Sequence, residues 1–315
     1  MRDAFSDALN AAPGRLAEML IKKVTKGDGS ELPDDVRARL DRLIDAPGRP
    51  GLLARVRLAA DVHYLFDRAP NWTKARLIPL FDWSSPDAGD VWSARKYSRS
   101  IGSPELFGLL KQPFLQMFGR SETPMEDLRT FAGGLTDVLI ANHANGAGYR
   151  LLATEARSAL RRAGVGALSS VGHRLAVEME RATAEQKLVH WRTVVGPVFQ
   201  AIWPLDVELQ TSATTFKLVQ ILLATGEAFP EASEIILPFI RPDRRDQTTV
   251  FSISQAPDEL YETAPSKMLD MIEAVVGEAA PGSVYSLEKA LSRLWAINPK
   301  LADTRKFQKL LTYAY

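Results

Sequence analysis

The sequence predicts an all-α protein built from stacked antiparallel helix pairs, a HEAT-like α-solenoid superhelix with little or no sheet. Apolar residues recur at intervals of three and four rather than two, which places them along one side of a helix. One such stripe consists of Leu52, Val56, Ala59, His63 and Phe66. Proline stands at first-turn positions and glycine where the apolar patterns end, and these are the usual start and stop residues of helices. Only one short segment has the composition of a strand.

Helices are predicted wherever this periodicity persists between such start and stop residues. The predicted segments are residues 2–11, 13–25, 33–45, 51–68, 71–81, 86–98, 104–119, 124–144, 152–163, 166–182, 184–203, 211–225, 230–240, 257–262, 265–277, 286–297 and 302–314. The strand candidate is residues 248–254, TTVFSIS, which is rich in β-branched residues but also suits a helix start with threonine caps. One lone strand cannot form a sheet, so either outcome leaves the all-α prediction in place.

The domain organisation expected from the sequence is one helical domain over residues 1–315. A weak recurrence of proline next to aromatic residues, as in IPLFDW and LPFIRP, suits a helical repeat of ~40 residues. Ordinary use of proline and aromatic residues in long helical proteins explains it equally well. If the chain divides, the expected boundary is the glycine-rich loop at 145–148, which separates residues 1–145 from 149–315.

Composition excludes several classes of protein. The chain has 46% hydrophobic and 24% charged residues, which is typical of a globular protein rather than a disordered one. Its 39 basic and 38 acidic residues leave a net charge of +1, so no global field attracts nucleic acid or an anionic membrane. Cysteine is absent, which excludes disulfides and thiolate chemistry. With no secretory leader and no apolar stretch of ~20 residues, we expect a cytoplasmic protein without a membrane span.

Motifs for catalysis or cofactor binding are not found in the sequence. The histidines do not have the spacing of a helical metal site, and they are His63, His143, His173 and His190. No phosphate-binding loop, dinucleotide fingerprint or serine nucleophile elbow occurs. The sequence therefore predicts a protein that is not an enzyme and that carries no metal and no cofactor.

Local clusters of basic residues are the candidate partner-binding sites. The loop at 241–247 contains no apolar residue except proline, so it is expected to face water. A second cluster lies on a predicted helix between two aromatic residues, and a third contains Arg157, Arg161 and Arg162. The residues selected as partner-binding are Arg241, Arg244, Arg245, Arg95, Lys96 and Arg99. The alternative interpretation is a solvated surface on which these side chains pair with nearby acids, including Asp90, Glu155, Asp243 and Asp246.

Several apolar blocks resemble a known family. They are NWTKARLIPLFDW at 71–83, ALNAAPGRLAEMLI near the start, WRTVVGPVFQAIWP at 191–204, EAFPEA at 227–232 and NPKLADTRKFQKL at 298–310. Together they resemble the helical domain of unknown function found C-terminal to sirtuin-like domains in bacterial anti-phage defence proteins. No pattern of that family is present at 147–180. The resemblance implies a helical sensor or regulatory region attached to an NAD-consuming effector.

The function expected from these observations is that of a non-catalytic sensor, regulatory or scaffold domain that acts by protein–protein recognition. Its partner would be a phage-encoded trigger or a sirtuin-like effector domain. The alternative is a helical-repeat nucleic-acid-binding protein that uses the arginine clusters and exposed tryptophan or tyrosine. The near-zero net charge weighs against that alternative.

Overall fold

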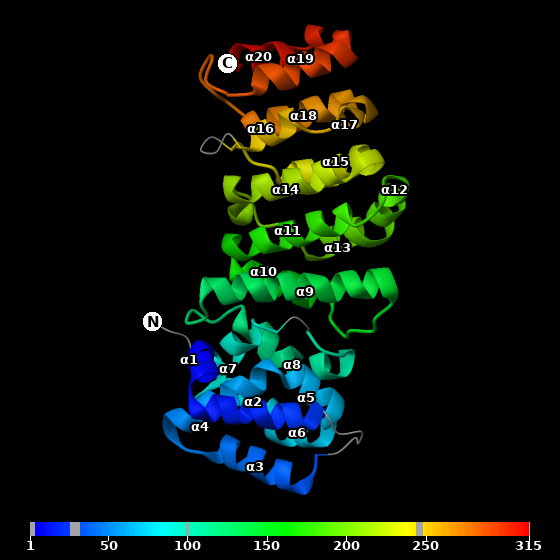
Figure 1. Cartoon of the computed structure of the whole chain (residues 1–315). Coiled ribbons are helices and arrows are strands. Elements are labelled where there is room, and N and C mark those ends of the chain that lie inside the picture. The colour runs from blue at the N-terminus through cyan, green and yellow to red at the C-terminus, as the bar shows by residue number, and fades with distance from the viewer. Residues whose placement is uncertain (1–3, 26–31, 99–100, 244–247, 315) are drawn as a thin grey trace. The chain divides into compact units, whose positions relative to one another are not determined.

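The computed structural model describes residues 4–25, 32–98, 101–243 and 248–314, and every regular element within them is a helix (Figure 1). The all-α prediction is therefore confirmed. The strand candidate at 248–254 is the helix α16 (Thr248–Ser254). Within the described ranges, extended pairing is limited to one isolated parallel bridge between Val284 and Ala314.

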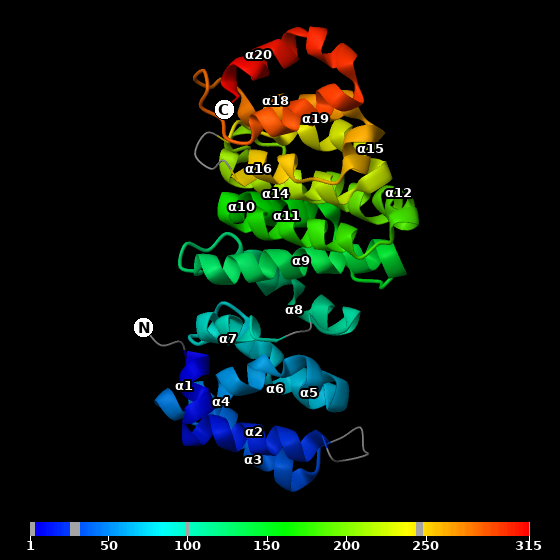
Figure 2. The same ribbon diagram turned by 45° about the horizontal axis from the view of Figure 1, so that its top comes forward.

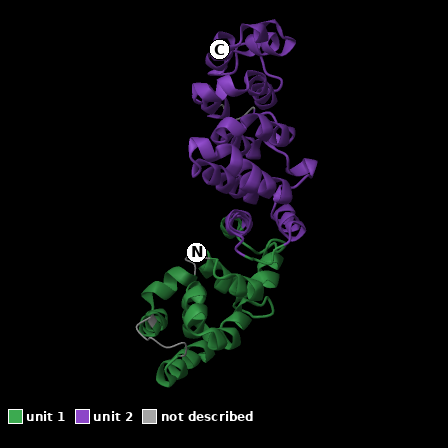
Figure 3. Cartoon of the chain, turned by 90° about the vertical axis from the view of Figure 1, so that its right-hand side faces the viewer, with its two compact units in different colours: residues 1–131, 148–151 green, residues 132–147, 152–315 purple. Residues whose placement is uncertain are grey.

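The chain divides into two compact units, which Figure 3 distinguishes by colour. Unit 1 comprises residues 1–131 and 148–151, and unit 2 comprises residues 132–147 and 152–315. The main change from one unit to the other falls within a helix, at 131/132, whereas the glycine-rich loop at 145–148 follows the end of that helix.

Unit 1 is built around one central helix, α4, which packs against α1, α2, α3 and α7. Its elements are α1 (Ala4–Asn10), α2 (Ala12–Thr25), α3 (Asp34–Asp45), α4 (Gly48–Ala60), α5 (Val62–Arg68), α6 (Pro70–Arg76), η1 (Ile78–Phe81), α7 (Ala88–Arg95), α8 (Pro104–Met117) and the first part of α9 (Met125–Asn145). Small residues allow the helices to approach closely, since Ala8, Ala60 and Ala94 lie in one buried cluster with Leu53 and Val56.

Unit 2 is a stack of helices in two columns, and Figures 1 and 2 show its successive layers. Its elements are the rest of α9, α10 (Ala153–Ala163), α11 (Val165–Glu180), η2 (Ala184–Gln186), α12 (Lys187–His190), η3 (Trp191–Val195), α13 (Gly196–Ile202), η4 (Val207–Leu209), α14 (Ser212–Ala224), η5 (Gly226–Ala228), α15 (Phe229–Ile236), η6 (Leu237–Phe239), α16, α17 (Asp258–Thr263), α18 (Pro265–Val276), α19 (Leu287–Ile297), η7 (Pro299–Asp303) and α20 (Arg305–Tyr313). In one column α11 packs on α14, α14 on α16 and α16 on α19. In the other, α10 packs on α13, α13 on α15, α15 on α18 and α18 on α20.

Local sequence explains where several helices start and stop. The Ser103 hydroxyl accepts a hydrogen bond of 3.2 Å from the backbone N–H of Leu106, and Pro104 occupies the first turn of α8. Gly277 ends α18 with φ +60°, a conformation that favours glycine. A Cβ there would lie 2.5 Å from the ring of Pro242, so the position also lacks room for a side chain.

Three predicted helices are interrupted in the structure. The segment at 71–81 divides at Leu77 into α6 and the 3-10 helix η1. The segment at 51–68 breaks at Asp61, which has φ −102° and ψ 18° and separates α4 from α5. The segment at 184–203 is divided by η3, which is a π-helical turn. Pro197 follows this turn and has no N–H for a normal helical hydrogen bond. Gly196 is also required there, because a Cβ would lie 2.8 Å from the carbonyl oxygen of Trp191.

Candidate functional site

The first predicted partner-binding residue, Arg241, forms its hydrogen bonds within unit 2. Its backbone N–H donates to the Thr215 hydroxyl at 3.1 Å, and its carbonyl accepts from the same hydroxyl at 2.7 Å. Its guanidinium donates to the carbonyl of Pro238 at 2.9 Å and to the Gln210 side chain. Arg241 therefore anchors the start of the loop at 241–247 to its own unit.

Of the remainder of that loop, the structure describes residues 242 and 243. Arg244 and Arg245, which we also predicted to bind a partner, lie outside the described residues. Asp243 is the third residue of the loop, and its backbone N–H donates to the carbonyl of Val275 at 2.8 Å. Its carboxylate accepts from the Thr249 hydroxyl at 2.8 Å. The described part of the loop is thus hydrogen-bonded to α16 and α18.

The second predicted cluster does not form the expected exposed basic surface. Arg95 is buried, with 6% of its surface exposed, and burial lowers the pKa of its guanidinium to about 10. The Lys96 ammonium lies 2.9 Å from the Asp127 carboxylate, and its side chain is only 11% exposed. Arg99 lies outside the described residues. Arg95 continues the buried stripe of α7 after Ala88, so helical spacing carries its side chain inward despite the charge.

The third basic cluster, on α10, is also engaged within unit 2. The Arg157 guanidinium donates to the carbonyl of Gln200, and the Arg161 guanidinium lies 2.6 Å from the Asp206 carboxylate. The nearby acid suggested by the sequence, Glu155, instead accepts the backbone N–H of Leu152 at 2.9 Å. These arginines therefore connect α10 to α13 and to the segment that follows it.

Two histidines lie beside polar neighbours in the structure. The Nδ1 atom of His63 lies 3.2 Å from the Ser98 hydroxyl, and burial, together with the charge of Arg95, lowers the pKa of His63. The Nε2 atom of His190 lies 3.2 Å from the Glu178 carboxylate. Within the described ranges, no group of three or more histidine, aspartate or glutamate residues could hold a metal ion. No described helix has the length and apolar character needed to cross a membrane.

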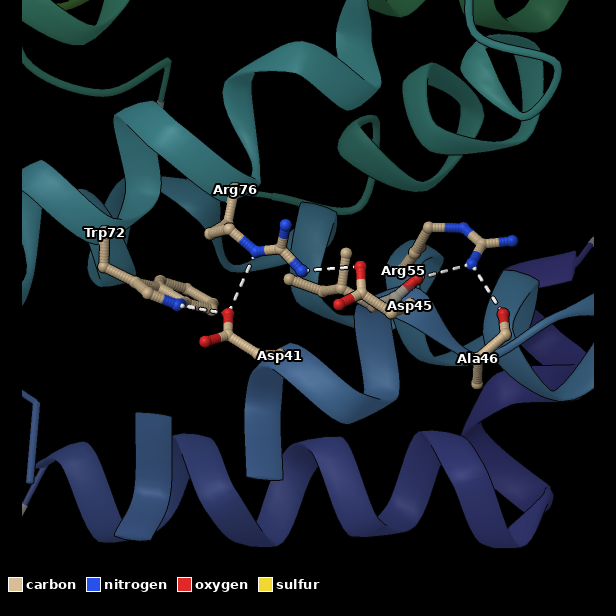
Figure 4. Close-up of polar contacts among 7 residues, drawn as sticks. Asp41, Asp45, Ala46, Arg55, Trp72 and Arg76 are labelled. Carbon is tan, nitrogen blue, oxygen red and sulfur yellow. Dashed lines mark hydrogen bonds and ion pairs between the residues drawn. The ribbon is translucent and has the colours of Figure 1, made fainter. Parts of the chain in front are cut away.

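The block at 71–83 connects α6 to α3 (Figure 4). The Trp72 indole N–H donates to the Asp41 carboxylate at 2.9 Å, and the Arg76 Nε donates to the same oxygen at 3.0 Å. A second nitrogen of Arg76 lies 2.6 Å from the Asp45 carboxylate. The polar residues of this block therefore fix the packing of helices.

A recurrent set of ion pairs links neighbouring helices of unit 2, and we call it the ion-pair ladder. Its partners are separated by 31 to 39 residues along the chain. The pairs are Asp137–Arg174, Arg192–Glu231, Glu234–Lys267, Asp258–Arg293, Asp270–Lys306 and Glu278–Lys309. Their side chains are partly exposed, and such pairs contribute only ~0–1 kcal/mol each. The ladder therefore adds little to the stability of the helices, and its main effect is to favour the observed choice of neighbouring helices.

Sequence reasoning missed a hollow in unit 1 that we call the acidic–aromatic pocket. It has a volume of about 260 Å³ and lies between the segment after η1, the start of α7, the end of α8 and the start of α9. Two indoles, Trp83 and Trp92, and three carboxylates, Asp90, Glu122 and Asp127, contribute to its wall. These residues come from separate elements, so no single sequence motif unites them.

These features define an all-α protein in which unit 2 is a two-column helical stack. The described residues of its arginine clusters and of the block at 71–83 hold helices together. The chain is 24% identical over 318 residues to a protein of Sinorhizobium fredii (strain NBRC 101917 / NGR234) described as "Uncharacterized protein y4cA". That match includes 98% of this chain and 26% of the other protein, so the chain spans about a quarter of the length of this relative. No family model and no solved structure matches the sequence.

Proposed function

We propose that this chain is a non-catalytic recognition or scaffold region that acts by protein–protein contacts. The observation that carries the proposal is the two-column helical stack of unit 2, because stacked helical arrays present extended surfaces on which successive layers contact one partner. The match to a quarter of a longer relative supports a role within a larger protein.

The biological setting we propose is bacterial anti-phage defence in the cytoplasm. The resemblance of the apolar blocks to the domain that follows sirtuin-like domains supports this setting. The partner is then a phage-encoded trigger or a sirtuin-like effector domain, and the chain conveys the presence of the trigger to the effector. Catalysis belongs to the effector, and this chain contributes recognition.

The contacts of the basic residues favour a protein partner over nucleic acid. Nucleic-acid binding depends on several exposed cations that contact phosphates. Arg95 is buried, Arg161 is paired with Asp206, and Arg241 is hydrogen-bonded within unit 2. With a net charge of +1 the chain also lacks a long-range attraction to phosphate.

The proposal is tested on the loop that follows α13, where Leu205 and Val207 are 61% and 69% exposed. The double substitution Leu205→Ser/Val207→Ser removes apolar contact area without disturbing the core. Bacteria that produce the full-length protein are challenged with phage, and association with the effector or trigger is measured by co-purification. We expect weaker association and protection from this variant.

Two controls complete the test. The exposed residue Glu208, in the same loop, is replaced by Gln as a matched surface change, and this variant should protect like the unaltered protein. The purified chain is also incubated with NAD and with nucleoside triphosphates, which should remain intact. Turnover at about one per second or faster would show an enzyme and overturn the proposal. Salt-sensitive binding to DNA or RNA, without any protein partner, would replace it with the nucleic-acid alternative.

A further inference from the structure

The acidic–aromatic pocket has walls that are held in place by main-chain hydrogen bonds. The Trp83 indole N–H donates to the carbonyl of Pro113 at 2.8 Å, and the Trp92 indole N–H donates to the carbonyl of Phe81 at 3.0 Å. The two rings lie nearly parallel, 16° apart, with centroids separated by 6.5 Å. Trp92 is only 3% exposed and supports the ring of Trp83 from within the fold, so Trp83, which is partly exposed, is the indole whose π surface can attract a cation.

The charged groups of the pocket are acidic. Among the described residues of its wall, Asp90, Glu122 and Asp127 are acids and none is basic, while Lys96 and Arg120, which do not line the pocket, pair with Asp127 and Glu122 respectively. Asp127 is only 2% exposed, and its two oxygens accept hydrogen bonds from Ser93 and Lys96. Each carboxylate oxygen can accept a further hydrogen bond, so this buried group keeps capacity for a donor. The wall therefore favours a cation with N–H groups over an anion.

The chain already places one of its own cations against this wall. The guanidinium carbon of Arg120 lies 4.4 Å from the centroid of the Trp83 ring, and the same guanidinium pairs with Glu122. This is the geometry of a cation–π contact supported by a carboxylate. An indole and an acid of the pocket thus bind a basic side chain within the protein itself, which is an observation independent of the acidic composition.

We propose that the acidic–aromatic pocket binds a lysine or arginine side chain of a protein partner. This inference rests on the proposed function for the existence of such a partner. A volume of about 260 Å³ lies below the ~300–1,000 Å³ of pockets that enclose whole small-molecule ligands, and it suits one inserted side chain. The aliphatic stem packs on the indoles and on Met117, and the cationic head reaches the carboxylates.

The glycines of unit 1 provide a matched pair of variants to test this pocket. Gly89 lines the pocket, and a Cβ built on it meets nothing within 4 Å, so Gly89→Leu adds a bulky side chain at the pocket wall without a clash at its Cβ. Gly108 is also exposed on a helix and also has nothing within 4 Å, but it does not line the pocket. Both substitutions remove a helical glycine, so Gly108→Leu controls for the effect on helix stability.

The probe is N-acetyl-arginine methylamide, and the matched control is N-acetyl-norleucine methylamide, which has an apolar stem without the charge. Binding to the full chain is followed by the indole N–H resonances of its six tryptophans, with Trp83 assigned through Trp83→Phe. We expect saturable shifts for Trp83 and Trp92 with the arginine probe alone. Gly89→Leu should weaken binding about tenfold, and Gly108→Leu should leave it unchanged.

Equal binding of the norleucine probe, or undiminished binding of the arginine probe to Gly89→Leu, would overturn the pocket proposal. So would partner association that is the same for Gly89→Leu and Gly108→Leu. The probe assay contains no partner, so its failure leaves the proposed function standing. The absence of any protein partner, with the probe still bound to the pocket, would instead overturn the proposed function.

Discussion

The contacts between α3 and α6 predict that two aspartates on one helix contribute very differently to stability. Asp41 accepts hydrogen bonds from the Trp72 indole and from Arg76, and its side chain is 35% exposed. Asp45 accepts from Arg76 alone, and its side chain is 65% exposed. We therefore compare Asp41→Ala with Asp45→Ala, which make the same chemical change one helical turn apart.

The expected magnitudes follow from the donors that each substitution leaves without a partner. Asp41→Ala leaves the Trp72 N–H and the Arg76 Nε–H unpaired in a half-buried position, and we expect a loss of about 2 kcal/mol. Asp45→Ala removes one exposed ion pair worth ~0.5 kcal/mol or less. It also removes a negative charge from the last residue of α3, where that charge opposes the helix dipole. We therefore expect no measurable decrease in the free energy of unfolding for Asp45→Ala.

The assay is urea unfolding at neutral pH, followed by tryptophan fluorescence and far-UV circular dichroism. The quantity compared is the free energy of unfolding of unit 1, which contains Trp72 together with Trp83 and Trp92. Double-mutant analysis with Arg76→Ala then separates the indole contact from the ion pair. Equal losses for the two aspartate variants, or an Asp41→Ala value within about 0.5 kcal/mol of the unaltered protein, would refute this reasoning.

Three further predictions concern buried charge, backbone conformation and pH. Since burial lowers the pKa of Arg95 from 12.5 to about 10, keeping it charged costs roughly 3 kcal/mol. Arg95→Met should therefore raise the free energy of unfolding by about 1 kcal/mol or more, after the loss of its polar interactions is deducted. A lower free energy of unfolding in urea titration would contradict this. Gly277 has φ +60°, and a Cβ there would lie 2.5 Å from Pro242, so Gly277→Ala should lower the free energy of unfolding by at least about 2 kcal/mol in thermal unfolding. Gly146 has the same φ in open space, and Gly146→Ala should lower it by about 1 kcal/mol. The pKa of His63 is lowered in the fold, so as pH falls below 6.5 the unfolded chain binds a proton first. The free energy of unfolding of the protein, relative to that of His63→Gln, should then decrease as the pH falls from 6.5 to 5. A difference between the two proteins that does not change with pH would contradict this.

The helical content could be predicted from sequence because periodicity and end residues are local properties. The segment at 33–45 corresponds to α3 (Asp34–Asp45), and that at 265–277 corresponds to α18 (Pro265–Val276). The break at Asp61 could not be predicted, because the apolar spacing of 51–68 continues through it. The sequence does not distinguish helix from strand at 248–254, since β-branched residues permit either structure and tertiary packing decides.

The candidate site was harder to predict because charge is not a measure of exposure. Arg95 occupies a helical position that faces the interior, and the spacing from Ala88 was the available indication. The acidic–aromatic pocket depends on side chains such as Trp83 and Asp127, which are distant in the chain and meet only through packing. Sequence periodicity carries no information about contacts between side chains that are distant in the sequence.

The ion-pair ladder has a consequence for how the length of this protein can change. Five of the pairs join helices that are neighbours in the stack, and the sixth joins Glu278, which follows α18, to α20. The partners are 31 to 39 residues apart. Duplication or loss of one whole helix pair, about 35 residues, leaves the remaining pairs matched. A shorter insertion displaces acids from their bases along the surface. Among related proteins, differences in length within this stack are therefore expected to be insertions or deletions of whole helix pairs.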